Sequence, residues 1–126
     1  MPVIRRTDNR RTETAGAVMT TLASPTLGGA ALAVWRVDMQ PGHAGPLHAI
    51  DAEQVWTVIA GAAALDLDGE TTIVAAGDTV VLPPDVPRRL RAEATGFAAL
   101  VSAPATMRAY RLDTGAAAKL TPPWVR

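Results

Sequence analysis

The chain has 126 residues, which is long enough for one domain with a single hydrophobic core. Twelve acidic side chains balance twelve basic ones, and this zero net charge argues against a nucleic-acid surface, which needs a basic surplus. The lack of cysteine excludes disulfides and thiolate metal sites. No apolar run approaches the ~20 residues of a membrane span, so we expect a soluble protein of the cytoplasm.

Many short strands separated by glycine and proline predict an all-β fold. Residues 1–16 are polar and rich in arginine, so we expect a solvated N-terminal arm, with one β domain over residues 17–126. Asp68-Gly69 predicts a type I′ hairpin turn. Alternation over residues 54–60 sets Gln54, Trp56 and Val58 on one face of a strand. Further strands are expected at residues 17–23, 30–39, 79–82, 97–103 and 106–112.

Two glycine-flanked stretches carry the functional signal. Residues 42–61 read GHAGPLHAIDAEQVWTVIAG, and residues 77–88 read GDTVVLPPDVPR. The first resembles the first motif of the cupin family: a glycine, five residues, a His-x-His pair, an acid or glutamine, six residues and a glycine. The second resembles the second cupin motif: a glycine, five residues, Pro-x-Gly, two residues and a histidine. The positions that match are Gly42, His48, Gln54, Gly61, Gly77 and Pro83.

This resemblance implies a small, single-domain, RmlC-like cupin, that is, a jelly-roll β-barrel or double-stranded β-helix. Cupins commonly hold a divalent metal with both histidines of the first motif, the Glu or Gln that follows, and the histidine of the second motif. The early strands of cupins often pair with a second subunit, so the resemblance also implies a homodimer.

The chain departs from the family pattern at three positions. Ile50 stands at the second histidine of the pair, Arg88 at the histidine of the second motif, and Asp85 at the glycine of that motif. Isoleucine has no lone pair and a guanidinium only donates hydrogen bonds, so two of the four ligand positions have lost their lone pairs.

We therefore expect no metal cofactor. A guanidinium ~5 Å from a divalent ion, at an effective dielectric constant of 20, would weaken binding by about 6 kcal/mol. The alternative is a divalent metal held by His48 and Gln54, with His43 or Asp51 substituting for the missing ligands.

Three interpretations of Arg88 remain open. A buried guanidinium needs a negative partner, which is either an anionic ligand or an internal acid, and Glu53 and Asp51 are the internal candidates. In the third interpretation the strand is rotated, Arg89 and Arg91 share the outer face, and Arg88 extends to the mouth of the barrel.

The candidate catalytic residues are His48, Arg88 and Gln54. His48 is the group that titrates near neutral pH, and the alternative for it is a hydrogen-bonded core or rim histidine. Gln54 would position a substrate, unless it is a buried amide satisfied by backbone groups. Candidate substrate contacts are Ile50, Trp56, Asp51 and Arg36, although core packing explains the first two and a solvated or ion-paired strand residue explains Arg36.

Two functions from different classes fit these residues. The first is a metal-independent isomerase, cyclase or lyase that acts by acid–base chemistry on an anionic or enolisable small molecule. The second is a cupin that binds a small molecule without catalysis. A metal-dependent cupin oxygenase or isomerase is a further alternative, because the fold by itself says little about the substrate.

Overall fold

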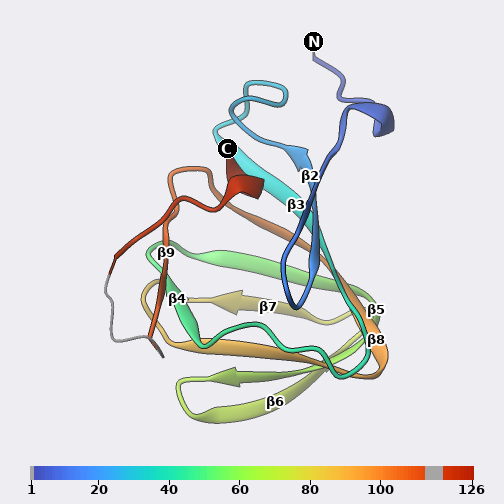
Figure 1. Ribbon diagram of the computed structural model, residues 1–126, viewed down its shortest axis with the longest axis vertical. Coiled ribbons are helices and arrows are strands. Elements are labelled where there is room, and N and C mark those ends of the chain that lie inside the picture. The colour runs from blue at the N-terminus through green and yellow to red at the C-terminus, as the bar shows by residue number, and fades with distance from the viewer. Residues whose placement is uncertain (1, 113–117) are drawn as a thin grey trace.

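The computed structural model describes residues 2–112 and 118–126, and within them the chain is built almost entirely of strands. The strands are β1 (Arg10–Glu13), β2 (Val18–Ala23), β3 (Leu32–Met39), β4 (His48–Ile50), β5 (Gln54–Leu67), β6 (Glu70–Ala75), β7 (Thr79–Leu82), β8 (Arg88–Pro104) and β9 (Ala109–Arg111). Two short 3-10 helices, η1 (Arg6–Asp8) and η2 (Pro123–Val125), lie near the chain ends (Figure 1). The all-β prediction is confirmed.

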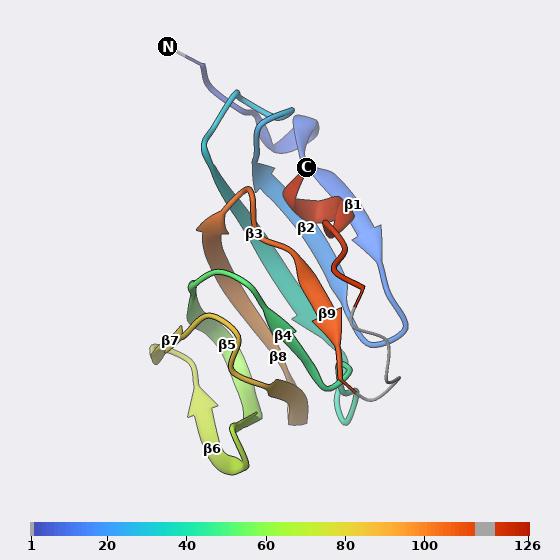
Figure 2. The ribbon, with the colours of Figure 1, turned by 90° about the vertical axis from the view of Figure 1, so that its left-hand side faces the viewer.

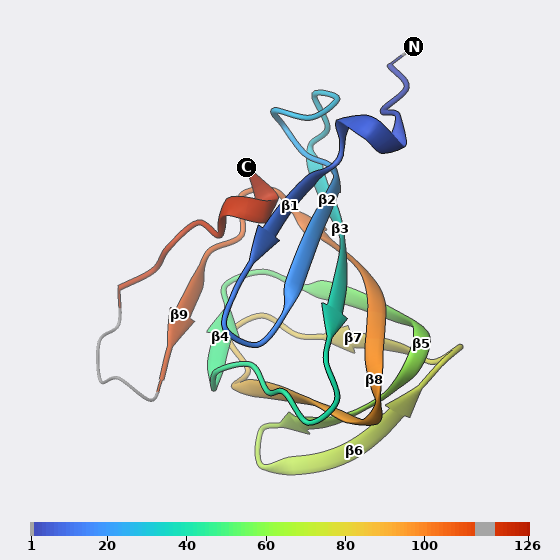
Figure 3. The same ribbon diagram turned by 45° about the vertical axis from the view of Figure 1, so that its right-hand side comes forward.

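The strands form one curled sheet that folds over on itself. Two long strands, β5 and β8, pair along most of their length, and both run through the two facing halves of the sheet (Figure 3). One half has the order β1-β2-β3-β8-β5-β7, and the other has the order β9-β4-β8-β5-β6. The expected jelly-roll barrel is therefore present.

The bend between the two halves is made by two glycines that lie against each other. Gly61 in β5 and Gly96 in β8 both have positive φ, 68° and 76°, in the left-handed region that favours glycine. A Cβ atom on Gly61 would overlap the carbonyl oxygen of Gly96. Gly61, the last residue of the first motif, is thus required for the closeness of the two strands.

The core lies between the two halves and is filled mainly by aliphatic side chains. Trp35 is the largest fully buried residue, and Val37, Val58, Leu82 and Val101 belong to the same cluster. At the end of the molecule where both chain termini lie, η2 packs on β1, β2 and β3 (Figures 1 and 3). There Thr21 Oγ1 donates to the carbonyl oxygen of Trp124, 2.8 Å away, and Val125 is fully buried.

Several local predictions are confirmed. Asp68 and Gly69 both have positive φ, as a type I′ hairpin turn requires, and Leu67 pairs with Glu70 across it. Several strands differ from expectation. The strand expected at residues 106–112 covers only Ala109–Arg111. Within the expected N-terminal arm, residues 10–13 form β1 and pair with β2. The strand expected at 97–103 begins much earlier, at Arg88.

Candidate functional site

Arg88 lies inside the barrel. Only 1% of its surface is exposed, so the interpretation in which it extends to the mouth is wrong. Its guanidinium turns back onto the proline-rich loop before it: Nη2 donates to the carbonyl oxygen of Pro83 at 2.7 Å, and Nε donates to that of Val86 at 3.0 Å. These bonds fix the side chain, because the loop prolines restrict the backbone that carries the two acceptors.

Gln54 is the centre of a buried hydrogen-bond network. Its Oε1 accepts from Arg88 Nη1 at 3.4 Å and from Trp56 Nε1 at 3.1 Å. Its Nε2 donates to the sulfur of Met107 at 3.3 Å. The indole of Trp56 in turn stacks on Phe97, with ring centroids 6.3 Å apart. Gln54 and Trp56 thus share a strand face, as the alternation predicted, and the amide is satisfied by side chains rather than by backbone.

The charge of Arg88 is only partly matched inside the protein. Among the described residues no carboxylate forms an ion pair with it, so the predicted pairing with Asp51 or Glu53 is wrong. Burial lowers the pKa of Arg88, while Tyr110 and Asp85 act in the opposite direction. Its three hydrogen bonds use three of five N–H groups, which leaves one donor on each terminal nitrogen.

His48 lies directly opposite Arg88 in the antiparallel pairing of β4 and β8, so the two side chains leave the same face of the sheet. Its Nδ1 lies 2.8 Å from the carbonyl oxygen of Pro46. Because a carbonyl only accepts, Nδ1 carries a hydrogen. The structure thus pairs the backbone positions of His48 and Arg88 and bonds Arg88 to Gln54, so the two motifs meet although they are distant in sequence.

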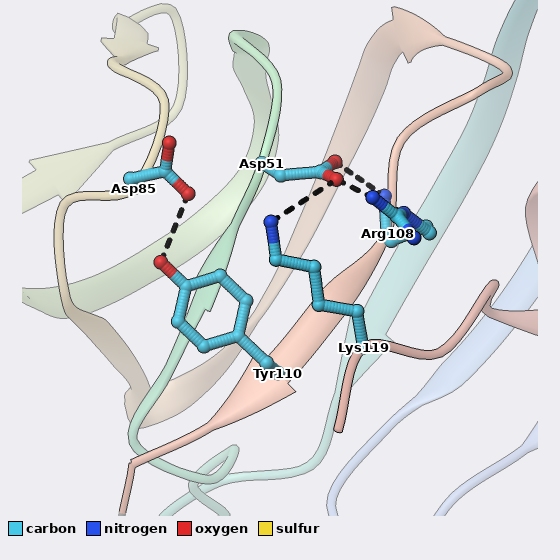
Figure 4. Close-up of polar contacts among 5 residues, drawn as sticks. All are labelled: Asp51, Asp85, Arg108, Tyr110 and Lys119. Atoms are coloured by element: carbon cyan, nitrogen blue, oxygen red, sulfur yellow. Dashed lines mark hydrogen bonds and ion pairs between the residues drawn. The ribbon is translucent and has the colours of Figure 1, made fainter. Parts of the chain in front are cut away.

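Arg108, Tyr110 and Lys119 contact the two acidic residues Asp51 and Asp85 (Figure 4). Asp51 Oδ1 accepts from the backbone N–H of Arg108 at 2.6 Å, and Oδ2 pairs with Arg108 Nε at 3.1 Å and Lys119 Nζ at 3.7 Å. The hydroxyl of Tyr110 donates to Asp85 Oδ1 at 2.9 Å. Asp51 therefore binds Arg108 and Lys119 and does not pair with Arg88.

Asp85 and Tyr110 show how the second motif tolerates its missing glycine. Asp85 has a φ of 61°, a left-handed conformation that aspartate adopts more readily than most residues. Its N–H bonds the carbonyl oxygen of Ile50 at 2.7 Å, which joins the two motif loops. The bond to Asp85 raises the pKa of Tyr110.

Sequence reasoning missed four residues of this region: Met107, Arg108, Tyr110 and Lys119. All lie after the second motif, where no motif spacing applies. A weak signal was present in Tyr110, the single tyrosine of the chain.

Arg36 does not belong to the site. It lies on the outer face of β3 and forms two bonds to Asp38, Nε to Oδ2 at 2.9 Å and Nη2 to Oδ1 at 3.0 Å. The structure thus shows the ion-paired strand residue that was the alternative to a substrate contact. Of the two apolar candidates for substrate contact, Ile50 is 3% exposed and belongs to the core cluster.

The barrel interior next to Trp56 is apolar and nearly full. A cavity of about 10 Å³ remains, which is about the space that one water molecule needs. It is lined by Trp56, Val58, Leu65, Val74, Val80, Leu82, Leu90 and Phe97. Any ligand that reaches Gln54 and Arg88 must therefore displace a side chain.

Residues 35–103, which contain both motifs, match the family described as Cupin domain. The chain belongs to the cupin family. No curated protein matches this cupin closely.

Solved structures similar to this cupin include several enzymes. A salicylate 1,2-dioxygenase from Pseudaminobacter salicylatoxidans is 28% identical with a TM-score of 0.70; the match covers 81% of this chain but only 32% of that one. The polyketide cyclase RemF from Streptomyces resistomycificus is 23% identical with a TM-score of 0.70, over 82% of this chain and 79% of that one.

An RmlC-like cupin from Shewanella frigidimarina is 21% identical with a TM-score of 0.68, over 79% of this chain and 86% of that one. At this level of identity, the matches to the polyketide cyclase and the RmlC-like cupin show the fold alone. Within the described residues of this cupin, no helix is long and apolar enough to cross a membrane.

The described residues at the site do not form a ligand set for a divalent metal. In residues 2–112 and 118–126, no three His, Cys, Asp or Glu side chains come together, so neither His43 nor Asp51 completes a ligand set with His48. The oxygen of Gln54 that would face an ion accepts hydrogen bonds from Arg88 and Trp56 instead. A buried guanidinium bonded to that oxygen would repel a cation at the same place.

Proposed function

We propose that this cupin binds a small organic anion at Arg88 and Gln54 and acts on it by proton transfer, without a divalent metal. The observation that carries the proposal is the buried guanidinium of Arg88, which has no ion pair in the described chain and two N–H donors left on its terminal nitrogens. Two such donors match the two oxygens of a carboxylate or the oxygen of an enolate.

The proton transfer is assigned to His48. Its Nδ1 is held by Pro46, which orients Nε2 as the base, and its strand position faces Arg88. In this mechanism Nε2 removes a proton from the carbon next to the substrate carbonyl. Arg88 stabilises the negative charge that develops on the carbonyl oxygen. Return of the proton to another carbon completes an isomerisation, whereas attack of the enolate carbon on a second carbonyl of the same substrate, with the proton passing to the new alkoxide oxygen, completes a cyclisation. Gln54 holds the substrate in place by hydrogen bonding.

Met107 marks where the ligand enters the network. Its side chain is fully buried and its sulfur accepts the amide hydrogen of Gln54. Because a thioether is a weak acceptor, a ligand oxygen replaces it at little cost. We infer that the substrate displaces Met107 from Gln54, so the loop of residues 105–108 moves when the substrate binds.

The test is deuterium exchange in D₂O at the carbon next to the carbonyl, followed by proton NMR for a panel of 2-oxo and 3-oxo acids. We expect the wild-type protein to accelerate exchange for at least one acid, both before and after dialysis against EDTA. His48→Gln should abolish the acceleration while the acid still binds. Arg88→Met, which keeps an apolar stem, should abolish binding as well.

Each contrary outcome has a distinct meaning. Exchange that persists in His48→Gln removes His48 from the mechanism. Exchange that disappears after EDTA treatment and returns with Fe²⁺, Mn²⁺, Ni²⁺ or Zn²⁺ establishes a metal-dependent enzyme. Acids that bind through Arg88 but never exchange establish the second candidate, a non-catalytic binding cupin.

We further propose that this cupin is a homodimer that pairs through the outer face of the β3-β8-β5-β7 half. On this face Val81 is 55% exposed and Leu100 is 39% exposed. The pairing register connects them, because Val81 lies opposite Val55, and Thr57, two residues along β5, lies opposite Leu100. These exposed apolar side chains, with Thr57 and the Arg36–Asp38 pair beside them, support burial against a second copy.

A further inference from the structure

A second hollow lies at the side of the barrel, between β6 and β7. Both strands pair only with β5 in the described chain, and they diverge from it toward different halves of the sheet (Figure 2). The groove that results has a volume of about 400 Å³. It is lined by Leu65, Leu67, Glu70, Thr72, Ile73, Val74, Asp78, Thr79 and Val80.

The groove adjoins the internal cavity beside Trp56, and packed side chains separate the two spaces. Leu65, Val74 and Val80 line both the groove and the internal cavity, so the two spaces share a wall of three aliphatic side chains. Val80 lies directly opposite Trp56 in the pairing of β5 and β7. Trp56 lies two residues, about 7 Å, along β5 from Gln54, to which its indole is bonded.

The chemistry changes along this line from polar to apolar. At one end are the guanidinium of Arg88 and the amide of Gln54, and in the middle is the indole face of Trp56. At the other end aliphatic side chains form the floor of the groove, and the carboxylates of Glu70 and Asp78 stand among its lining residues. A ligand that fits all of it has one negatively charged end and an apolar body without a second negative charge.

We propose that this cupin takes amphipathic monocarboxylic acids, with the carboxylate on Arg88 and the apolar body directed past Trp56 into the groove between β6 and β7, where it displaces the side chains of Leu65, Val74 and Val80 that separate the groove from the cavity. The proposal rests on the proposed function for the position of the carboxylate. The groove adds what that function leaves open, namely the class of substrate. Glu70 and Asp78 select against dicarboxylic acids, because a second carboxylate at the groove meets like charge.

The test uses butyrate, octanoate and suberate as probes, with dissociation constants from calorimetry and amide shifts from NMR. A buried methylene strengthens binding about fourfold, so the four additional methylenes of octanoate should give at least a tenfold advantage over butyrate. Suberate should bind at least tenfold more weakly than octanoate. Octanoate, but not butyrate, should shift the amides of β6 and β7.

Thr72→Trp fills the groove from a residue that is exposed and lines it, so the fold is retained. It should weaken octanoate at least tenfold and leave butyrate unchanged. Thr71→Trp is the matched control, since Thr71 is exposed and lies one residue from Thr72 but does not line the groove. Melting temperatures of both variants should stay near the wild-type value.

The outcomes separate this inference from the proposed function. Equal affinity for butyrate and octanoate, or no effect of Thr72→Trp on octanoate, overturns the assignment of the groove, whereas loss of both acids in Arg88→Met still supports the anion site. If Thr72→Trp weakens octanoate but Arg88→Met does not, the carboxylate assignment and the proposed function are both wrong, and the groove alone is an apolar binding site.

Discussion

Among single residues, Met107 both packs in the core and accepts the hydrogen bond of Gln54 that the proposed ligand would take. It is fully buried, so Met107→Ala should cost about 2–5 kcal/mol of unfolding free energy. The same change removes the group that a ligand must displace from Gln54, so affinity for octanoate should rise several-fold. Calorimetry and urea denaturation measure the two effects. Met39→Ala, in the same core but without a bond to Gln54, should lose stability with no gain in affinity; an equal gain there would refute the displacement.

Asp51 makes the free energy of unfolding depend on pH in the acid range. Burial raises the pKa of Asp51, but the bonds from Arg108 and the charges of Arg108 and Lys119 lower it more, so its pKa is below the ordinary 3.8. A lowered folded-state pKa stabilises the protein fully above the ordinary value, and this stability is lost as pH falls through the folded value.

Asp51→Asn should therefore be less stable than wild type at pH 7, and the difference should shrink below pH 4 and vanish near the lowest pH at which the fold persists. Urea denaturation at several pH values measures it. Asp68→Asn, which removes a turn carboxylate without an ion pair in the described chain, should show no such trend.

The site could be predicted from sequence as far as the motifs reach. The motif register identified His48, Gln54 and Arg88, and the structure pairs the backbone positions of His48 and Arg88 and bonds Arg88 to Gln54. The partners of Arg88 were not predictable, because its bonds to Pro83 and Val86 depend on how the loop folds back. The bond between Asp51 and Arg108 was missed for a similar reason, since the two residues are 57 positions apart and no local pattern links them.

At the scale of elements, the close crossing of β5 and β8 depends on Gly61. Gly61→Ala adds a methyl group that collides with the backbone of Gly96 and also forces alanine into a left-handed conformation. Gly69→Ala imposes a similar conformation at a turn where nothing lies within 4 Å of the added atom. Gly69→Ala should cost about 1–2 kcal/mol, and Gly61→Ala at least about 2 kcal/mol more. Thermal denaturation compares them, and equal losses would show that the crossing tolerates a side chain.

Strand positions were predictable where apolar residues alternate or a turn has a strong signature, as at Asp68-Gly69. The first part of β8 was not, because Arg88, Arg89, Arg91 and Glu93 look like an exposed loop. In the structure β5 supplies both the neighbouring backbone and Asp66, which lies opposite Arg89. Tertiary pairing therefore overrides the weak strand preference of these charged residues.

For the whole molecule, the proposed homodimer predicts that the outer face of the β3-β8-β5-β7 half controls assembly. Leu100→Asp or Val81→Asp should convert the dimer to a monomer, because each places an unpaired charge in the interface. Ile73→Asp, at 56% exposure on β6 in the other half, is the control and should leave the mass unchanged. Analytical ultracentrifugation measures the mass, and a wild-type monomer at all concentrations would contradict the proposal.

The pairing of β8 with β3, β4 and β5 also sets the order in which this chain is able to fold during synthesis. These three strands precede β8 in the sequence, and none of them can complete its pairing until β8 has been synthesised. A nascent chain that has not passed residue 104 therefore carries open strand edges, which are prone to aggregation. Slow translation or premature termination before residue 104 should therefore cause more aggregation than the same event within the last 20 or so residues.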